Sequence, residues 1–441
     1  MKLKSPASAV VLALAITAGG ASAQGLLSID AVTDYWQDVP FNISASASAG
    51  WDSNSNAASE DAQDSAYLAA SVTAAYGKKG KRSNTSIGVD VGVSHYLDSI
   101  EGLEDTTYNS RGFFNYSRAM SPRLTFSNNL YATYEVEPDY EVGVSTSRRE
   151  DQYIYLFDQM SLSYAWTNRL STTASYSIGT IIYEDDDLGD RENRLEQGAS
   201  LQANYRLTRR TSAVGEYRMS WVNYDSLQAD STSYFLLAGL DHAFSPRMSG
   251  TLRAGAQFYD SSRTTTAAPY VEAALSYLVD RRTSFRHYHR LGFEGADLGV
   301  YDSRYAYRTG LSGTHQFSER LSGNVGAHYS YSLYNLGSDA VELGQSFIDD
   351  VDDARDNALR AADAAGVELT DDQLAVFDVA EDELAPTDDL TEHQINLNLG
   401  LSYRLFSNVD VNAGYTYTTV SSNEDRDYDR HRLSLGVGAS F

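Results

Sequence analysis

Four arginines lie within a stretch of 23 residues, at spacings that could place their side chains on one surface. Arg286 and Arg290 are four residues apart, and so are Arg304 and Arg308. In an extended strand, residues separated by an even number lie on the same face. Two neighbouring strands would therefore carry four guanidinium groups on one wall, and such a wall would attract anions in a water-filled channel.

Other charged residues share this predicted face. Arg253 lies on a nearby strand and Arg218 farther away, and both would extend the basic wall. Acidic residues also fall at inward positions, namely Glu196, Glu216, Asp241, Glu272 and Glu294. Arginines that pair with these carboxylates would be scaffolding of the inner wall, whereas unpaired ones would select anions. The sequence leaves both interpretations open.

The strands that would position these residues are visible as a period of two. In "TEHQINLNLGLSYRLF", from Thr391, apolar residues alternate with polar ones from Ile395 to Leu405. Such alternation is typical of a strand with one apolar and one polar face. We predict 18 strands, which begin near Val39, Ser65, Asn84, Thr107, Arg123, Asp151, Arg169, Glu192, Thr211, Thr232, Met248, Thr266, Thr283, Ser303, Leu321, Thr391, Val409 and Asp429.

A short phrase recurs between pairs of strands. It reads "MSPRLT", "WTNRLS", "LTRRTS", "FSPRMSG", "VDRRTS" and "FSERLSG", with arginines at 123, 169, 210, 247, 282 and 320. Small polar residues and proline suit tight turns. The intervals of 46, 41, 37, 35 and 38 residues each fit two strands, one short turn and one longer, acidic loop.

Alternation is compatible with a soluble sandwich or with a membrane barrel. In a sandwich the apolar faces pack against each other, whereas in a membrane barrel they face lipid and the polar faces line the lumen. Strands of about 14 residues exceed the roughly 9–11 needed to cross a bilayer. Short turns alternate with long loops, and 32 tyrosines could supply an interfacial girdle. These features predict an all-β fold, a transmembrane antiparallel up-and-down β-barrel, that occupies residues 39–441.

The ends and the composition narrow the functional class. Residues 1–23 have a basic start, an apolar stretch and "ASA" before Gln24, which predicts a cleaved signal peptide followed by a short segment, 24–38. The chain has no cysteine, which excludes disulfides and thiolate sites. A net charge of −26 argues against nucleic acid as a partner.

One segment breaks the hairpin rhythm. Residues 337–390 add about 50 residues to a single loop and carry 17 Asp and Glu but only two Arg. Capping signals, such as Thr370 followed by Gln373, predict short helices in an acidic extracellular insert. These helices could narrow the barrel mouth or stand outside it, and outside is the simpler expectation.

The C-terminus carries the clearest resemblance to a known group. "HRLSLGVGASF" places Leu435, Val437, Ala439 and the terminal Phe441 on one face. This ending resembles the signal by which the barrel assembly machinery recognises Gram-negative outer-membrane proteins. With the predicted signal peptide and strand pattern, the chain resembles the outer-membrane β-barrel porin family, and specifically the porin type associated with exopolysaccharide loci.

The resemblance implies a location in the cell outer membrane, contact with outer-membrane lipid and lipopolysaccharide, and passive diffusion of small hydrophilic solutes. The alternative is a structural or polysaccharide-export-associated barrel whose lumen is closed by loops. No enzyme motif, cofactor motif or metal-ligand constellation stands out. We therefore expect no enzyme, no cofactor and no metal, and the sequence does not specify an oligomeric state.

Overall fold

A closed ring of β-strands forms the described part of the chain. The computed structural model describes residues 41–99, 104–136, 152–185, 189, 193–225, 230–261, 265–295, 301–336, 390–423 and 427–441. The predicted signal peptide 1–23, the segment 24–38 and all but the last residue of the predicted helical insert 337–390 lie outside the described residues.

The described residues contain 18 strands. They are β1 (Phe41–Asp52), β2 (Ser65–Lys79), β3 (Ser83–Tyr96), β4 (Thr106–Ala119), β5 (Leu124–Glu135), β6 (Tyr153–Ala165), β7 (Leu170–Tyr183), β8 (Arg194–Arg206), β9 (Thr211–Tyr224), β10 (Ser231–Ser245), β11 (Met248–Ser261), β12 (Thr265–Leu278), β13 (Thr283–Gly295), β14 (Tyr301–Gln316), β15 (Leu321–Leu336), β16 (Thr391–Phe406), β17 (Val409–Ser422) and β18 (Tyr428–Ser440). The sequence prediction is confirmed in number, and each strand begins within two residues of its predicted start.

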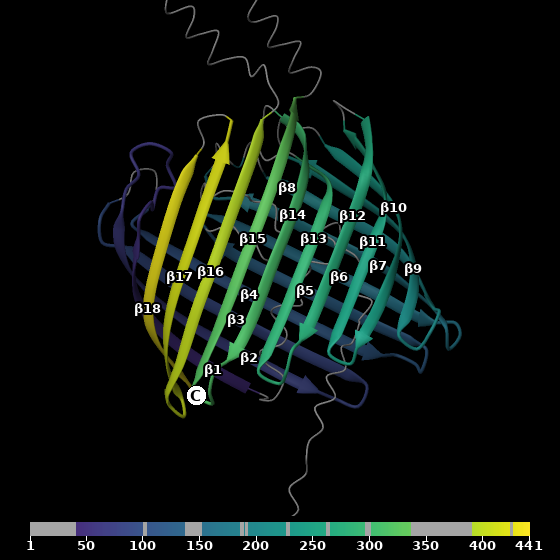
Figure 1. The fold of residues 1–441 in the computed structure, drawn as a ribbon, viewed down its shortest axis with the longest axis horizontal. Coiled ribbons are helices and arrows are strands. Elements are labelled where there is room, and N and C mark those ends of the chain that lie inside the picture. Colours follow the sequence, from purple (N-terminus) through teal and green to yellow (C-terminus); the bar gives the residue numbers. More distant parts are fainter. Residues whose placement is uncertain are drawn as a thin grey trace, which may run out of the picture.

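Each strand pairs antiparallel with its neighbours in the chain, and β18 returns to pair with β1. The ring is therefore closed (Figure 1). Short turns and the C-terminus lie at one end of the barrel. Because an unpaired strand edge cannot be tolerated in lipid, closure is the arrangement that a membrane requires of a sheet.

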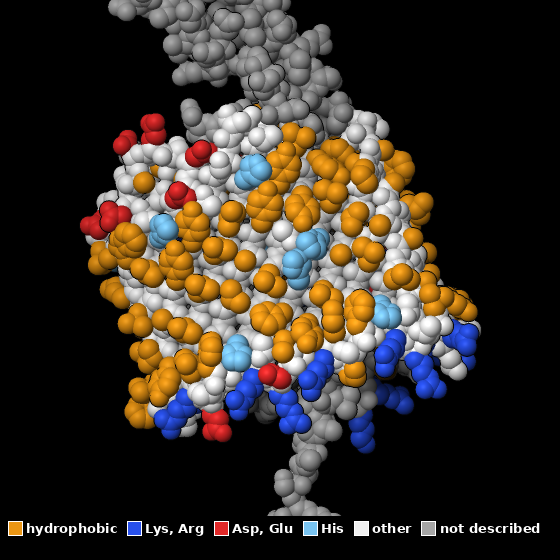
Figure 2. Space-filling view, in the orientation of Figure 1, with side chains coloured by type: hydrophobic (Ala, Val, Ile, Leu, Met, Phe, Trp, Pro, Cys, Tyr) orange, Lys and Arg blue, Asp and Glu red, His pale blue; other side chains and the backbone are white. Residues whose placement is uncertain are grey.

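The barrel is apolar outside and polar inside. On β16, Leu397, Leu399 and Leu401 are exposed, whereas Gln394 and Asn396, on the other face, are buried. Figure 2 shows the apolar side chains as a broad band on the outside of the front strands. This is the inverse of a soluble sandwich, so the membrane-barrel interpretation of the alternation holds. Among the described residues, no helix is long and apolar enough to cross a membrane.

Backbone hydrogen bonds explain the recurrent turn phrase. In all six turns, the Ser, Thr or Asp side chain accepts the backbone N–H of the arginine two residues later, at 2.7–3.2 Å. In the turn that contains Asp280, this bond from Arg282 holds the pKa of the carboxyl group below its ordinary value. Each arginine carbonyl then accepts an N–H from the neighbouring hairpin, for example Ala165 N–H on Arg123 at 2.8 Å. The phrase thus links each turn to the next one around the rim.

In the two phrases that begin with Phe and end with Gly, ring packing explains the glycine. A Cβ on Gly250 would lie 3.1 Å from the ring of Phe244, and one on Gly323 would lie 3.0 Å from the ring of Phe317. The aromatic ring folds across its own hairpin onto the glycine. Any larger residue there would push the ring aside.

The seam that closes the ring carries a buried ion pair. β1 and β18 pair from Ser44 with Ser440 to Asp52 with Arg432. Arg430 donates from Nη2 and Nε to the Asp52 carboxylate at 2.6 and 3.0 Å, and Tyr96 donates to it at 3.3 Å. Asp52 is fully buried. A paired charge at this position specifies the register of the last strand against the first.

The terminal residue extends this seam, and we expect it to matter for assembly. Phe441 N–H donates to the Ile43 carbonyl at 2.8 Å, and its side chain is 77% exposed on the apolar outer surface. Phe441→Asp places a charge on the lipid-facing surface. A basic residue on this face costs about 2–4 kcal/mol at the bilayer midplane, and Asp, or a position nearer an interface, costs less. The amount of heat-modifiable barrel in outer membranes should fall, while export across the inner membrane should not.

The matched control is Phe406→Asp, which changes an exposed aromatic at the turn between β16 and β17. That variant should insert closer to normally, because Phe406 does not lie on the closing seam. Equal losses in the two variants would contradict a special role for Phe441.

Candidate functional site in the barrel lumen

The charged residues on the inner wall form two joined sets between β9 and β14. The first set surrounds Arg218 on β9, which has no exposed surface. Its Nε lies 2.9 Å from Glu216 and its Nη2 lies 3.0 Å from Glu272 on β12. Tyr270 donates to Glu272 at 2.9 Å. Two carboxylates thus surround one guanidinium, which leaves this set with a local charge of −1.

Aromatic rings complete the surroundings of Arg218. Its guanidinium carbon lies 5.2 Å from the centre of the Phe235 ring and 5.6 Å from that of Tyr270. Cation–π contacts at this range stabilise a desolvated cation. The side chain spans from β9 to β12 along the inner wall, so it ties together strands that are not adjacent in the sheet.

The second set has the opposite balance. Glu294 on β13 binds Arg290 at 2.8 Å, Arg308 at 2.9 Å and Arg304 at 3.3 Å. Arg304 also donates to Tyr334 at 3.0 Å. Three guanidiniums thus bind one carboxylate. Glu272 and Arg290 are register partners across β12 and β13, so the two sets meet there.

The remaining residues of the predicted wall lie elsewhere. Arg253 pairs with Asp241 at 2.7 Å, and Glu196 pairs with Arg194 on its own strand at 2.9 Å. Arg286 is partly buried and lies nearer the turn end of β13, with Ser276 and Ser312 as register partners. The arginines named from the sequence are therefore mostly in ion pairs rather than arranged as one bare cationic wall.

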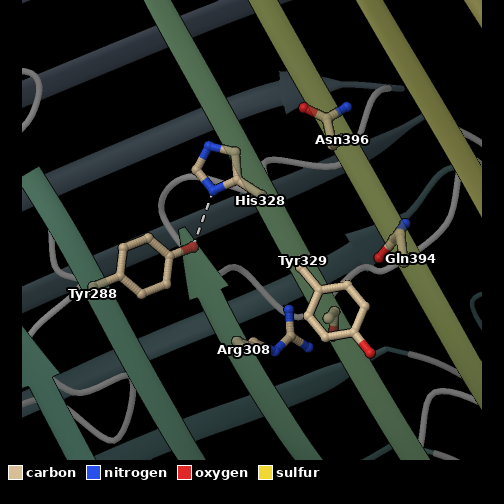
Figure 3. A pocket seen from close by; sticks show the side chains of 7 residues that line it. Tyr288, Arg308, His328, Tyr329, Gln394 and Asn396 are labelled. Atoms are coloured by element: carbon tan, nitrogen blue, oxygen red, sulfur yellow. Dashed lines mark hydrogen bonds between the residues drawn. The ribbon is translucent and has the colours of Figure 1, made fainter. Parts of the chain in front are cut away.

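A small polar recess adjoins Arg308. It is lined by Tyr288, Arg308, His328, Tyr329, Ser330, Gln394 and Asn396 and has a volume of about 20 Å³ (Figure 3). Tyr288 Oη and His328 Nδ1 lie 3.0 Å apart on one side of it. This volume accommodates about one water molecule or one polar group of a solute. The recess offers hydroxyl, imidazole, amide and guanidinium groups at one point of the wall.

The opposite wall is aromatic. Tyr131, Tyr153, Tyr155, Phe157, Ile181 and Tyr183 pack together on the inner faces of β5, β6 and β7 and are buried. In a ring of 18 strands, β5 to β7 lie nine strands from β14 to β16, and therefore across the barrel. The assignment of the tyrosines to an interfacial girdle is wrong for this group, because their strand parity turns them inward, where they pack against each other.

Sequence reasoning also missed residues whose partners are distant in the chain. Tyr270 and Tyr334 complete the two charged sets, and His328 completes the recess. Strand alternation predicts that these side chains point inward. It does not predict their contacts, because side chains that reach across one or more strands are not specified by register alone.

Among the described strands, the shortest ladder joins β12 and β13. The ladder joins only eight residue pairs, from Val271 with Leu291 to Leu278 with Ser284. Continuation of this register would place Pro269 opposite Phe293, and proline has no N–H to donate. Gln257 on β11 substitutes: its Oε1 accepts Phe293 N–H at 2.8 Å, and its Nε2 donates to the Phe293 carbonyl at 2.9 Å.

Other side chains seal the same seam. Tyr305 donates to the Pro269 carbonyl at 3.2 Å, and the Phe293 ring lies 5.0 Å from Tyr305 and 6.1 Å from Tyr259. A Cβ on Gly292 would lie 2.5 Å from the ring of Tyr270, so only glycine allows this ring to pack here. Side chains thus replace the main-chain ladder at this end of the two strands.

The assembly residues lie where the sequence predicts an outward face. Leu435, Val437 and Phe441 are exposed on the outside of β18 and just beyond it. Ala439 is a register partner of Ala45 on β1. Their role in recognition by the assembly machinery stays a prediction.

Comparisons with known proteins give structural similarity alone. No family model matches the sequence, and no curated protein matches it. Among solved structures, the chain is similar to OccAB4 of Acinetobacter baumannii, with 11% identity, a TM-score of 0.44, and coverage of 92% of this chain and 99% of that one. It is also similar to the outer membrane protein OpdK of Pseudomonas aeruginosa, with 10% identity, a TM-score of 0.43, and coverage of 91% and 99%. Similarity at this identity and TM-score carries no argument about the fold, so the barrel is established by the strand pairing within this chain.

We expect Gln257→Leu to destabilise the barrel. The substitution keeps much of the side-chain volume but leaves the N–H and carbonyl of Phe293 without these partners, which costs about 1–3 kcal/mol for a buried polar group. The midpoint of unfolding in denaturant, followed by loss of heat-modifiable mobility, should fall accordingly.

Gln394→Leu is the control, because this inward glutamine lies on a seam where Gln394 and Ser330 are paired in an intact ladder. Its backbone bonds remain, so a smaller loss is expected. If Gln257→Leu destabilises no more than Gln394→Leu, the glutamine does not substitute for the missing rung.

Proposed function

We propose that the protein is an outer-membrane channel through which small hydrophilic solutes diffuse passively. The observation that carries this proposal is the closed ring of 18 antiparallel strands, apolar outside and polar inside. Barrels of 16 to 18 strands are wide enough to leave an aqueous lumen. Export by the signal peptide, insertion by the barrel assembly machinery and contact with lipopolysaccharide belong to the same proposal.

The charge distribution favours a modest preference for anions. Glu294 binds Arg290, Arg304 and Arg308, so guanidiniums outnumber carboxylates three to one among these four residues of the inner wall. The adjoining recess adds polar groups that could contact a solute next to Arg308. An anionic solute would gain most where the pathway passes this set, because fixed charges act most strongly at short range in a low-dielectric wall.

The second candidate is a structural or export-associated barrel with a closed lumen. One observation favours it: inward side chains such as Arg218, Tyr153 and Ile181 have almost no exposed surface. Side chains that line a wide aqueous channel would be expected to contact water. No catalytic function is proposed.

Single-channel recording in planar bilayers decides between these candidates. The folded, purified protein should give discrete conductance steps if the lumen is open. Folded protein that inserts into the bilayer and yet gives no resolvable current would favour the closed barrel.

Ion selectivity tests the role of the Glu294 set. Glu294→Gln should shift the reversal potential under a salt gradient toward anions, because the variant removes a carboxylate that binds three guanidiniums. Arg308→Gln should shift it in the opposite direction. Both shifts should diminish as salt rises, since the Debye length falls from about 10 Å at 0.1 M to about 3 Å at 1 M.

Glu319→Gln provides the control, because this exposed residue lies in the turn between β14 and β15, outside the strands that form the inner wall. It carries the same charge change as Glu294→Gln. If Glu319→Gln shifts selectivity as much as Glu294→Gln, or if neither substitution at the Glu294 set has an effect, the set does not line the conducting pathway.

A further inference from the structure

We infer that the arginines of the six turn phrases form a collar that binds the phosphate headgroups of anionic phospholipids in the periplasmic leaflet. The collar consists of Arg123, Arg169, Arg210, Arg247, Arg282 and Arg320. Short turns of membrane barrels face the periplasm and long loops face outward, which places the collar at the inner leaflet. The inference does not depend on whether the lumen conducts.

The turn itself does not require arginine. Within each phrase, the turn uses the backbone N–H and the backbone carbonyl of this residue. Any residue other than proline could supply both groups. The six-fold recurrence of a guanidinium therefore has to be explained by what its side chain does.

The six side chains are available for a ligand. All six residues are exposed, and none of them forms an ion pair with another described residue. Arg247 donates to a backbone carbonyl, that of Val279, at 3.1 Å. A guanidinium presents a planar fork of donors that fits phosphate better than an ammonium group does.

The first residue of the phrase indicates that the ligand is a lipid. Three positions before the arginine, five of the six phrases have a large apolar side chain that is between 51% and 58% exposed: Met120, Trp166, Leu207, Phe244 and Phe317. An exposed apolar group next to a cation suits the boundary between acyl chains and headgroups. Figure 2 shows a row of basic side chains along the rim, directly below the apolar band.

The charge balance of this rim is opposite to that of the whole chain. The eight turns and adjoining strand ends, residues 78–84, 118–125, 164–171, 205–212, 244–249, 277–284, 315–322 and 403–410, contain 15 Lys and Arg but three Asp and Glu. The whole chain has a net charge of −26. Successive phrase arginines are two strands apart, roughly 10 Å around the rim at the usual strand spacing, so each could contact a separate headgroup.

Trp166 gives a local probe, because it lies in the same turn as Arg169. The full-length chain with Trp36, Trp51 and Trp221 changed to Phe retains Trp166 as its single tryptophan. This protein is reconstituted into phosphatidylcholine vesicles that contain phosphatidylglycerol at a fixed fraction. Either one lipid or the other carries brominated acyl chains, and quenching of Trp166 then reports which lipid lies next to the turn.

Brominated phosphatidylglycerol should quench Trp166 more strongly than its bulk fraction predicts, and added salt should reduce the excess. The excess should disappear when Arg123, Arg169 and Arg210 are changed to Gln. It should persist in part when the same three are changed to Lys, which keeps the charge but loses the fork. Heat-modifiable mobility checks that each variant is folded. If the triple variant does not fold, Arg169→Gln alone replaces it and should reduce the excess quenching by half or more.

Two results would overturn the inference. One is quenching in proportion to bulk composition in the protein with all its arginines, which would leave an acidic periplasmic protein as the partner to seek. The other is an excess that survives the change to Gln in folded protein. Either result would leave single-channel conductance untouched, so failure of this inference and failure of the channel proposal are distinguishable.

Discussion

The closed ladder of main-chain hydrogen bonds is the constraint on which the rest of this structure depends. Hydrocarbon offers no partner to a backbone N–H or C=O, so a sheet can cross it only when its first strand pairs with its last. β1 and β18 meet this requirement. Once the ring is closed, strand geometry turns every second side chain toward the lumen and the others toward lipid. The inner wall is thus a consequence of the ladder.

A polar inner wall in a thin protein shell brings a second requirement, which is charge pairing. Arg218 has no exposed surface and binds two carboxylates, while Glu294 binds three guanidiniums. Loss of one partner from such a buried pair strongly destabilises the folded state, because the remaining charge stays desolvated. The inner wall is therefore a network of ion pairs rather than a row of bare arginines.

Two seams show how polar side chains support the main-chain ladder. At the closing seam, Asp52 and Arg430 bind across the last contact in the ring. Between β12 and β13, Pro269 cannot donate, and the amide of Gln257 supplies both missing bonds to Phe293. At both seams polar side chains join strands across the gap between them, but only between β12 and β13 do they take the place of main-chain bonds.

The sequence by itself determined the fold class, the number of strands, their starts to within two residues and the alternation of an apolar with a polar face. All of these follow from a period of two, from turn chemistry and from the need to close a sheet, which are local rules. It predicted Arg290, Arg304, Arg308 and Glu294 on one face without showing that one carboxylate binds three arginines. Tertiary structure alone decided those partners, the inward aromatic wall around Tyr153 and the bridge made by Gln257. The physical reason is that side chains which reach past one or more strands depend on barrel curvature, strand tilt and rotamer, and strand periodicity encodes none of these.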